Sequence, residues 1–211
     1  EREWINGAED ASRHGRNVID VYLDLRAAGR VGPLVLVFPG LTSDDNAIPS
    51  ALVNMRAPEL ASGASGLGSG RFADYFFGEL IPAVDAQFPT LGGRARGLLG
   101  FSMGGAMAIK AAAERPGLFA SAGAYDGTFL YAIDRGRRVR VDGVVRNPMF
   151  DAAFGLPRDT RFIARNSPAN LLMRADADAL AGITWTIGYG ARRNEPWQAN
   201  FFRGEHLVGC L

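Results

Sequence analysis

The segment at residues 94–115 constrains the fold more than any other. In it the pentapeptide Gly100-Phe101-Ser102-Met103-Gly104 lies between a predicted strand and a predicted helix. Residues 94–99 form the short strand, and residues 106–115 form an alanine-rich helix that Pro116 ends. A G-x-S-x-G sequence in this setting is typical of a nucleophile elbow, a strained turn that lifts the serine hydroxyl above the sheet. Ser102 is therefore a candidate nucleophile. An ordinary glycine-rich turn is the alternative, since the chain has 27 glycines.

The remaining segments predict strands that alternate with helices. Residues 34–38 are a continuous apolar run, which favours a strand buried on both faces of a parallel sheet. Further strands are expected at residues 17–25, 118–125 and 183–188. Helices are expected at residues 72–88, with a kink at Pro82, at residues from 168 on, with Ser167 as the cap, and at residues 198–211. This order predicts an α/β fold with a mostly parallel central sheet.

A length of 211 residues, 47% of them hydrophobic, suits a single domain over residues 1–211. Residues 128–165 are expected to be irregular and to form a cap-like insertion. Their basic cluster is either a solvated loop or a patch that receives an anionic substrate group; it comprises Arg135, Arg137, Arg138 and Arg140. Their aromatic residues either line an acyl site or form the core of the cap; these are Phe129, Tyr131 and Phe150.

Composition narrows the class of protein. The net charge is +1, so we expect no nucleic-acid partner, and no apolar run is long enough for a membrane span. A single cysteine, Cys210, leaves no intrachain disulfide, and two histidines are too few for a metal site of several imidazoles. The sequence does not reveal the oligomeric state or the localisation, although a secreted or cell-envelope location is favoured over a cytoplasmic one.

Catalysis by a serine needs a histidine to accept its proton, an acid to orient the histidine, and two N–H donors for the oxyanion. In a site of this kind one donor is the residue after the serine, here Met103. The other comes from the loop after the strand at residues 34–38, where Leu41 is the candidate.

Four segments resemble the putative-esterase branch of the α/β-hydrolases, which includes esterase-D-like enzymes, feruloyl esterases and mycolyltransferases. They are residues 39–46 (PGLTSDDN), 76–85 (FFGELIPAVD), 100–105 (GFSMGG) and the pair AFG at 153–155 with SP at 167–168. The resemblance covers most of the chain and implies an α/β-hydrolase fold with helices on both faces of the sheet. Pro39 departs from the histidine that is common in the family and absent from mycolyltransferases.

The resemblance also implies the acid and the base. Glu195 lies in a loop like the one that ends in Asn-Glu in mycolyltransferases; the alternative is a surface glutamate paired with Arg192 or Arg193. Of the two histidines, His14 precedes the first predicted strand, whereas His206 follows Glu195 in the order serine, acid, histidine. His206 lies within a predicted helix only 11 residues later, and the alternative is a chain that stops before its true base.

The predicted function is that of a serine carboxylester hydrolase or acyltransferase that acts on a small-molecule ester through an acyl-enzyme on Ser102. It needs no metal or organic cofactor. Whether water or a sugar hydroxyl receives the acyl group stays open. The alternative from another class is a non-catalytic binding protein with a hydrolase fold.

Overall fold

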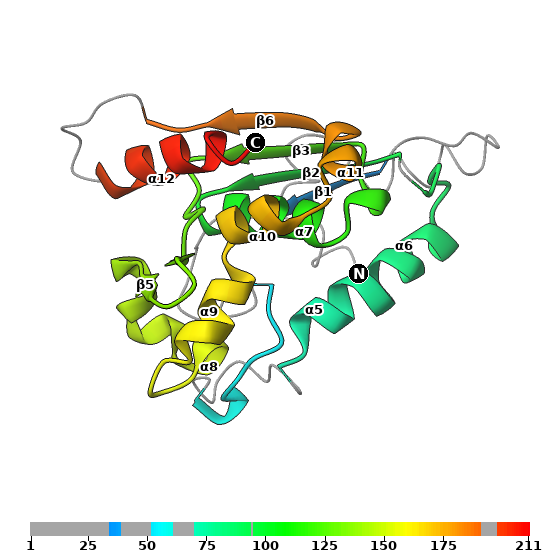
Figure 1. Cartoon of the computed structure of the whole chain (residues 1–211). Helices are drawn as coiled ribbons and strands as arrows, with labels where there is room; N and C mark the ends of the chain where they lie inside the picture. The colour runs from blue at the N-terminus through cyan, green and yellow to red at the C-terminus, as the bar shows by residue number, and fades with distance from the viewer. Residues whose placement is uncertain (1–33, 39–51, 61–69, 94, 191–197) are drawn as a thin grey trace, which may run out of the picture.

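A four-stranded parallel sheet forms the centre of the molecule (Figure 1). The computed structural model describes residues 34–38, 52–60, 70–93, 95–190 and 198–211. The strand order is β1-β2-β3-β6, with β1 at Leu34–Phe38, β2 at Arg96–Phe101, β3 at Ser121–Tyr125 and β6 at Thr184–Gly188. Each neighbouring pair is parallel, which confirms the predicted α/β fold. The strand expected at residues 17–25 lies outside the described residues.

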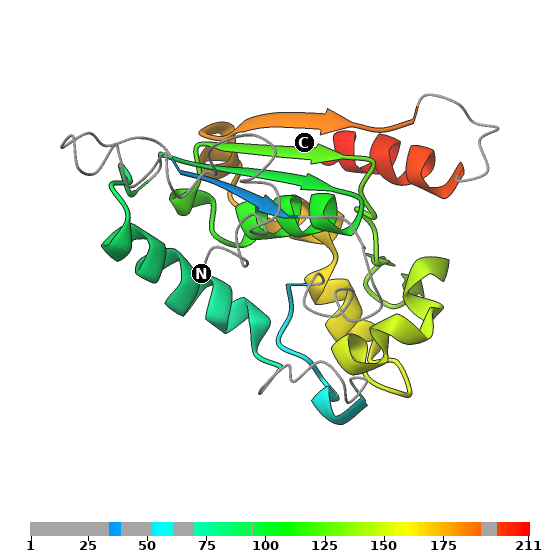
Figure 2. The same ribbon diagram turned by 180° about the vertical axis from the view of Figure 1, so that it is seen from behind.

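The central helix is α7, Met103–Glu114, which packs against β1, β2 and β3. Its buried face is rich in alanine, and the lack of large side chains lets the helix approach the sheet closely. Further helices on the same side include α10 at Pro168–Arg174, α11 at Ala177–Ala181 and α12 at Gln198–Val208 (Figures 1 and 2). The opposite face of the sheet carries exposed apolar side chains, namely Val35, Val37, Leu99, Phe101 and Tyr125.

The predicted helix at 72–88 exists but accommodates its proline differently than expected. It comprises α5 at Phe72–Tyr75, a π-helical segment at Phe76–Leu80 and α6 at Ile81–Gln87. The Ile81 N–H donates to the carbonyl of Phe76, five residues back. Pro82 has no N–H and its ring clashes with a carbonyl four residues back in a regular α-helix, and the wider π turn avoids that arrangement.

Residues 128–165 are regular, which corrects the expectation of an irregular segment. A hairpin of β4, Ala132–Asp134, and β5, Val139–Val141, is followed by 3-10 turns at Gly143–Arg146 and Pro148–Phe150. Two helices complete the segment, α8 at Asp151–Phe154 and α9 at Thr160–Asn166. Other 3-10 turns lie at Pro58–Leu60 and Pro116–Leu118. We call residues 128–165 the cap segment.

The cap segment and the start of α7 share one apolar core. Phe154 and Ile163 of the cap pack with Met103 and Ala106 of α7. Of the aromatic residues that the sequence left open, Tyr131 and Phe150 belong to this core and Phe129 to the neighbouring cluster, and all three are fully buried. They are core residues in this structure: the ring of Tyr131 packs against Phe150 and Phe154, whose rings stack on each other.

Two polar contacts fix the cap segment to the helices behind it. Ser167 precedes α10 as predicted, but its hydroxyl makes no capping bond. It accepts instead from the N–H of Tyr131 at 3.1 Å, because this buried N–H has to be satisfied at the start of the hairpin. The carboxylate of Asp142 accepts from the Arg203 guanidinium of α12, with Nε at 3.1 Å.

Among the described residues, no helix is both long enough and apolar enough to cross a membrane.

Candidate active site

Ser102 occupies a strained turn between β2 and α7. Its backbone φ is +54° and its ψ is −118°, a conformation that side-chain-bearing residues rarely adopt. Such strain costs roughly 1–3 kcal/mol and is typical of functional sites. Gly100 makes the turn feasible, because a Cβ at that position would lie 2.1 Å from the backbone oxygen of Gly104. The strand-turn-helix geometry predicted for the elbow is therefore present in the structure.

Positive backbone dipoles converge on Ser102 from the start of α7. Met103 is the first residue of this helix, and the N–H groups of a first helical turn have no acceptor within the helix. The partial positive charge at the N-terminus favours an anion there. The Ser102 hydroxyl makes no capping bond to these N–H groups. The arrangement leaves the Met103 N–H available for a negatively charged oxygen next to Ser102.

Two buried hydroxyl groups hold the Met103 side chain behind the turn. Tyr131 Oη donates to Met103 Sδ at 3.4 Å, and Thr128 Oγ1 donates to the same sulfur at 3.7 Å. Burial raises the pKa of Tyr131 well above its usual value, so the phenol stays protonated and remains a donor. Sequence reasoning named Tyr131 only as an acyl-site or cap-core residue and missed Thr128, since nothing in the pattern links position 103 with positions 128 and 131.

The sheet register places an aspartate, Asp126, at the strand end beside Ser102. Phe101 of β2 pairs with Tyr125 of β3, so Ser102 and Asp126 follow directly at neighbouring strand ends. The Ser102 N–H donates to the Tyr125 carbonyl at 2.9 Å. On its other side the Asp126 N–H donates to the carbonyl of Gly188 at 2.7 Å. Asp126 also has a positive φ, +48°. The signal for it in the sequence was an apolar strand that ends in Asp-Gly.

The other predicted site residues are only partly placed. Leu41 and Glu195 lie outside the described residues. His206 lies on α12, half-buried, with Nε2 3.9 Å from Cys210 Sγ. Within the described part of the chain, Ser102 Oγ and His206 form no hydrogen bond with each other. The roles of Leu41, Glu195 and His206 stay predictions.

In the ranges that the structure describes, no three histidine, cysteine, aspartate or glutamate side chains come together in a way that could hold a metal ion.

Comparison with known proteins gives a match over most of the chain. The model of the family described as putative esterase matches residues 22–201. No curated protein sequence matches the chain. A solved ferulic acid esterase superposes with a TM-score of 0.57 at 14% identity, covering 89% of this chain and 75% of that one. An S-formylglutathione hydrolase from Agrobacterium tumefaciens superposes with a TM-score of 0.51 at 14% identity, covering 88% and 85%. At this identity the two superpositions show a shared fold.

Proposed function

Since this chain belongs to the putative esterase family and is a serine esterase or acyltransferase of the α/β-hydrolase type, we propose that it acts through an acyl-enzyme on Ser102. The strained conformation of Ser102 at the N-terminus of α7 carries the proposal. A serine that merely capped α7 would gain nothing from a left-handed backbone and would use its hydroxyl for the cap.

In the proposed reaction Ser102 Oγ attacks the acyl carbonyl while a histidine takes the hydroxyl proton. The negative oxygen of the tetrahedral intermediate accepts hydrogen bonds from the Met103 N–H and from a second donor, for which we propose Leu41. The intermediate collapses when the C–O bond to the alcohol breaks and the histidine returns the proton to the leaving alkoxide. Water or another hydroxyl then attacks the acyl-enzyme by the same steps in reverse order.

Labelling with a fluorophosphonate tests the nucleophile. The intact protein is expected to take up one label per chain and to hydrolyse p-nitrophenyl acetate, and Ser102→Ala is expected to abolish both. Ser121→Ala is the matched control, because Ser121 begins β3 and lies at the end of the parallel strands opposite to Ser102. Absence of labelling in the folded wild-type protein would contradict the proposal and favour a non-catalytic binding protein.

The base is assigned by comparing the two histidines of the chain. His206→Gln is expected to lower kcat by a factor of about 10³ or more, as loss of a triad member does, whereas His14→Gln serves as the control. Equal activity of the two variants would remove His206 from the mechanism.

The acid is assigned in the same way from two carboxylates. Glu195 follows the strand β6, and Asp126 lies beside Ser102 through the sheet register. We propose Glu195 as the acid, so Glu195→Gln is expected to lower kcat far more than Asp126→Asn. The opposite order would move the assignment to Asp126.

The choice between hydrolysis and transfer rests on the acceptor. The two structural relatives are named for a feruloyl ester and for S-formylglutathione, and we propose both compound classes as first substrates to assay. Product analysis with and without an added sugar separates the outcomes, because transfer yields a new ester and hydrolysis yields the free acid.

A further inference from the structure

The cap segment carries a larger net positive charge than the entire chain. It contains eight arginines, four aspartates and no glutamate, a net charge of +4, whereas the entire chain has a net charge of only +1. A local excess of this kind attracts anions to one region of an otherwise nearly neutral protein.

Ion pairs neutralise most of the aspartates of the cap segment but leave most of its arginines unpaired. Three of the aspartates are paired: Asp142 with Arg203, Asp151 with Arg158 and Asp159 with Arg56. Six exposed arginines of β5, the turn between β4 and β5, and α9 have no ion pair among the described residues. These six define the arginine surface: Arg135, Arg137, Arg138, Arg140, Arg161 and Arg165.

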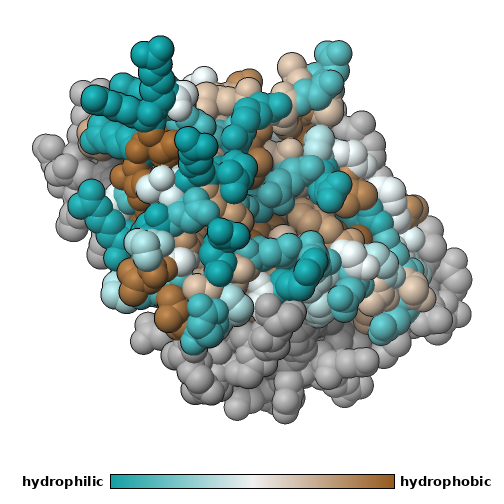
Figure 3. All heavy atoms as spheres, turned by 60° about the horizontal axis from the view of Figure 1, so that its bottom comes forward, coloured by the Kyte–Doolittle hydropathy of each residue, from teal (hydrophilic) through white to brown (hydrophobic). Residues whose placement is uncertain are grey.

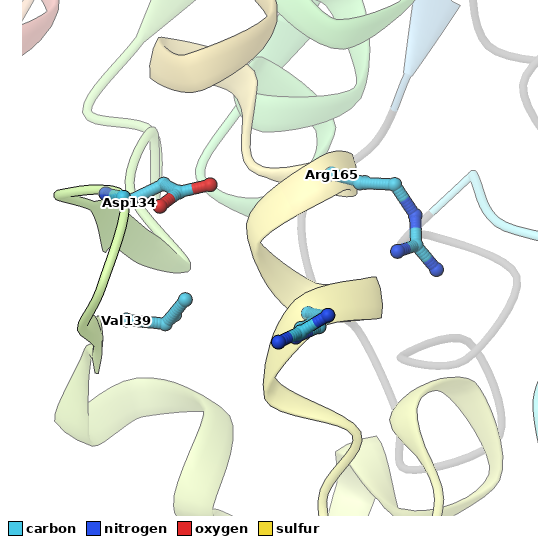
Figure 4. Close-up of a pocket in the computed structure, with 5 residues that line it drawn as sticks. Asp134, Val139 and Arg165 are labelled. Carbon is cyan, nitrogen blue, oxygen red and sulfur yellow. Dashed lines mark hydrogen bonds between the residues drawn. The ribbon is translucent and has the colours of Figure 1, made fainter.

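Two residues of the arginine surface, Arg161 and Arg165, line a pocket between the hairpin and α9. The pocket has a volume of about 270 Å³ and is lined by Asp134, Gly136, Val139, Arg161 and Arg165. Figure 4 shows that Asp134 and Val139 point from the hairpin toward α9, whereas Arg165 extends from α9 away from the hairpin. Asp134 would repel a single anion in this pocket. The cationic groups are thus spread over the hairpin turn and around α9, which suits an extended ligand with several negative charges.

The side chains of this surface also narrow the chemistry of the ligand. None of the large hydrophobic residues that are exposed in the described ranges belongs to the β4–β5 hairpin or to α9. Hydrophilic side chains cover much of the face in Figure 3, with apolar groups in small separate areas. Membrane docking uses apolar side chains that enter the bilayer, and single-stranded nucleic acids stack on aromatic rings. The arginine surface offers neither.

The surface lies at the same end of the sheet as Ser102. Tyr131 directly precedes β4 and contacts Met103, the residue after Ser102. The turn at residues 135–138 follows four to seven residues later, roughly 13–23 Å along an extended chain. A chain of several sugar units can span this distance, with an ester at Ser102 and acidic groups on the arginines.

We propose that the arginine surface binds an acidic polysaccharide, the anionic chain that carries the ester cleaved or transferred at Ser102. The proposal rests on the proposed function, because the polymer has to carry a carboxylic ester. Arginine suits the role, since its planar guanidinium forms paired hydrogen bonds with carboxylate or phosphate groups.

Binding of polygalacturonate to the full chain tests the proposal. At low salt the wild-type protein is expected to bind polygalacturonate and not the neutral polymer dextran, with an affinity that falls as NaCl screens the charges. Arg137→Glu with Arg138→Glu is expected to weaken binding at least tenfold. The control is Arg71→Glu with Arg115→Glu, which changes the net charge equally but lies directly before α5 and directly after α7, outside the cap segment. Circular dichroism verifies that both double variants are folded.

Three results would overturn the proposal: no binding of polygalacturonate at low salt, equal loss in the two double variants, or tighter binding to phosphatidylserine vesicles or single-stranded DNA than to polygalacturonate. Failure of the binding proposal can be distinguished from failure of the proposed catalytic function, because Ser102→Ala is expected to bind polygalacturonate as the wild type does. A protein that binds the polymer but takes up no fluorophosphonate would retain the surface and lose the catalytic role.

Discussion

The phenol of Tyr131 donates a hydrogen bond to Met103 Sδ at 3.4 Å, and it does so from a fully buried position directly behind the proposed nucleophile. A buried hydroxyl needs a partner, and here the partner belongs to the residue whose N–H we assign to the oxyanion. The contact connects the cap segment with the elbow.

We therefore expect Tyr131→Phe to affect turnover as well as stability. Loss of one hydrogen bond of this kind is expected to lower the free energy of unfolding by about 0.5–1.5 kcal/mol. If the transition state loses a similar amount of stabilisation, kcat falls by about 2- to 10-fold with little change in KM. Steady-state kinetics measure the effect, and Tyr125→Phe, at an exposed position, is the control. Unchanged kcat in Tyr131→Phe would show that the contact is purely structural.

Gly100→Ala is expected to disrupt the elbow. The new Cβ would meet the backbone oxygen of Gly104 at 2.1 Å, and backbone atoms of a buried helix start cannot yield locally. We expect destabilisation by about 3 kcal/mol or more and loss of fluorophosphonate labelling. Gly78→Ala is the matched control, because a Cβ there meets nothing within 4 Å and alanine is favoured over glycine in a helix. Chemical denaturation compares the two, and equal stability would contradict the steric argument.

The backbone strain at Ser102 predicts that replacing this serine by glycine stabilises the protein while it removes the nucleophile. Ser102→Ala and Ser102→Gly both remove the nucleophile, but only glycine adopts a φ of +54° without strain. The relief of roughly 1–3 kcal/mol is expected to exceed the entropy that glycine adds to the unfolded chain. Thermal unfolding should place the midpoint of Ser102→Gly above that of Ser102→Ala, and the reverse order would argue against strain.

Lys110 makes stability depend on pH. Its side chain is buried on α7 beside Glu114, and burial lowers its pKa although Glu114 opposes the shift. Between the lowered pKa and the unfolded value near 10.5 the unfolded state binds more protons, so stability is expected to rise with pH across that window. Lys110→Met should remove this slope. A parallel pH profile of the two proteins in urea denaturation would refute the prediction.

Asp142 and Arg203 are expected to couple the cap segment to α12. Both side chains are largely buried, so removing one partner leaves the other charge without compensation. In a cycle of Asp142→Asn, Arg203→Gln and the double variant, we expect a coupling free energy of about 1–3 kcal/mol. The exposed pair Arg71 and Asp74 should give no more than about 1 kcal/mol and serves as the reference.

Local patterns in the sequence were sufficient for the elements that depend on neighbouring residues. The apolar run at 34–38, the glycines around Ser102 and the alanines of α7 predict a strand, a tight turn and a close-packed helix, and each is present. The expected burial of the strand on both faces is wrong, because Val35 and Val37 are exposed on the face away from α7. The physical reason is that backbone conformation and burial on both faces restrict the residue types within a few positions. The family resemblance followed from the same local segments.

Tertiary structure decided how distant residues meet. The cap segment is ordered by packing against Met103 and Ala106 of α7. Its sequence looks irregular because the spacing of its apolar residues follows these contacts with another element and not the period of a helix or strand. The Ser167 hydroxyl accepts from the N–H of Tyr131, 36 positions away, and does not cap α10. The register of β2 and β3 brings Asp126 beside Ser102. Such contacts depend on how strands align and side chains interlock, so no local pattern contains them.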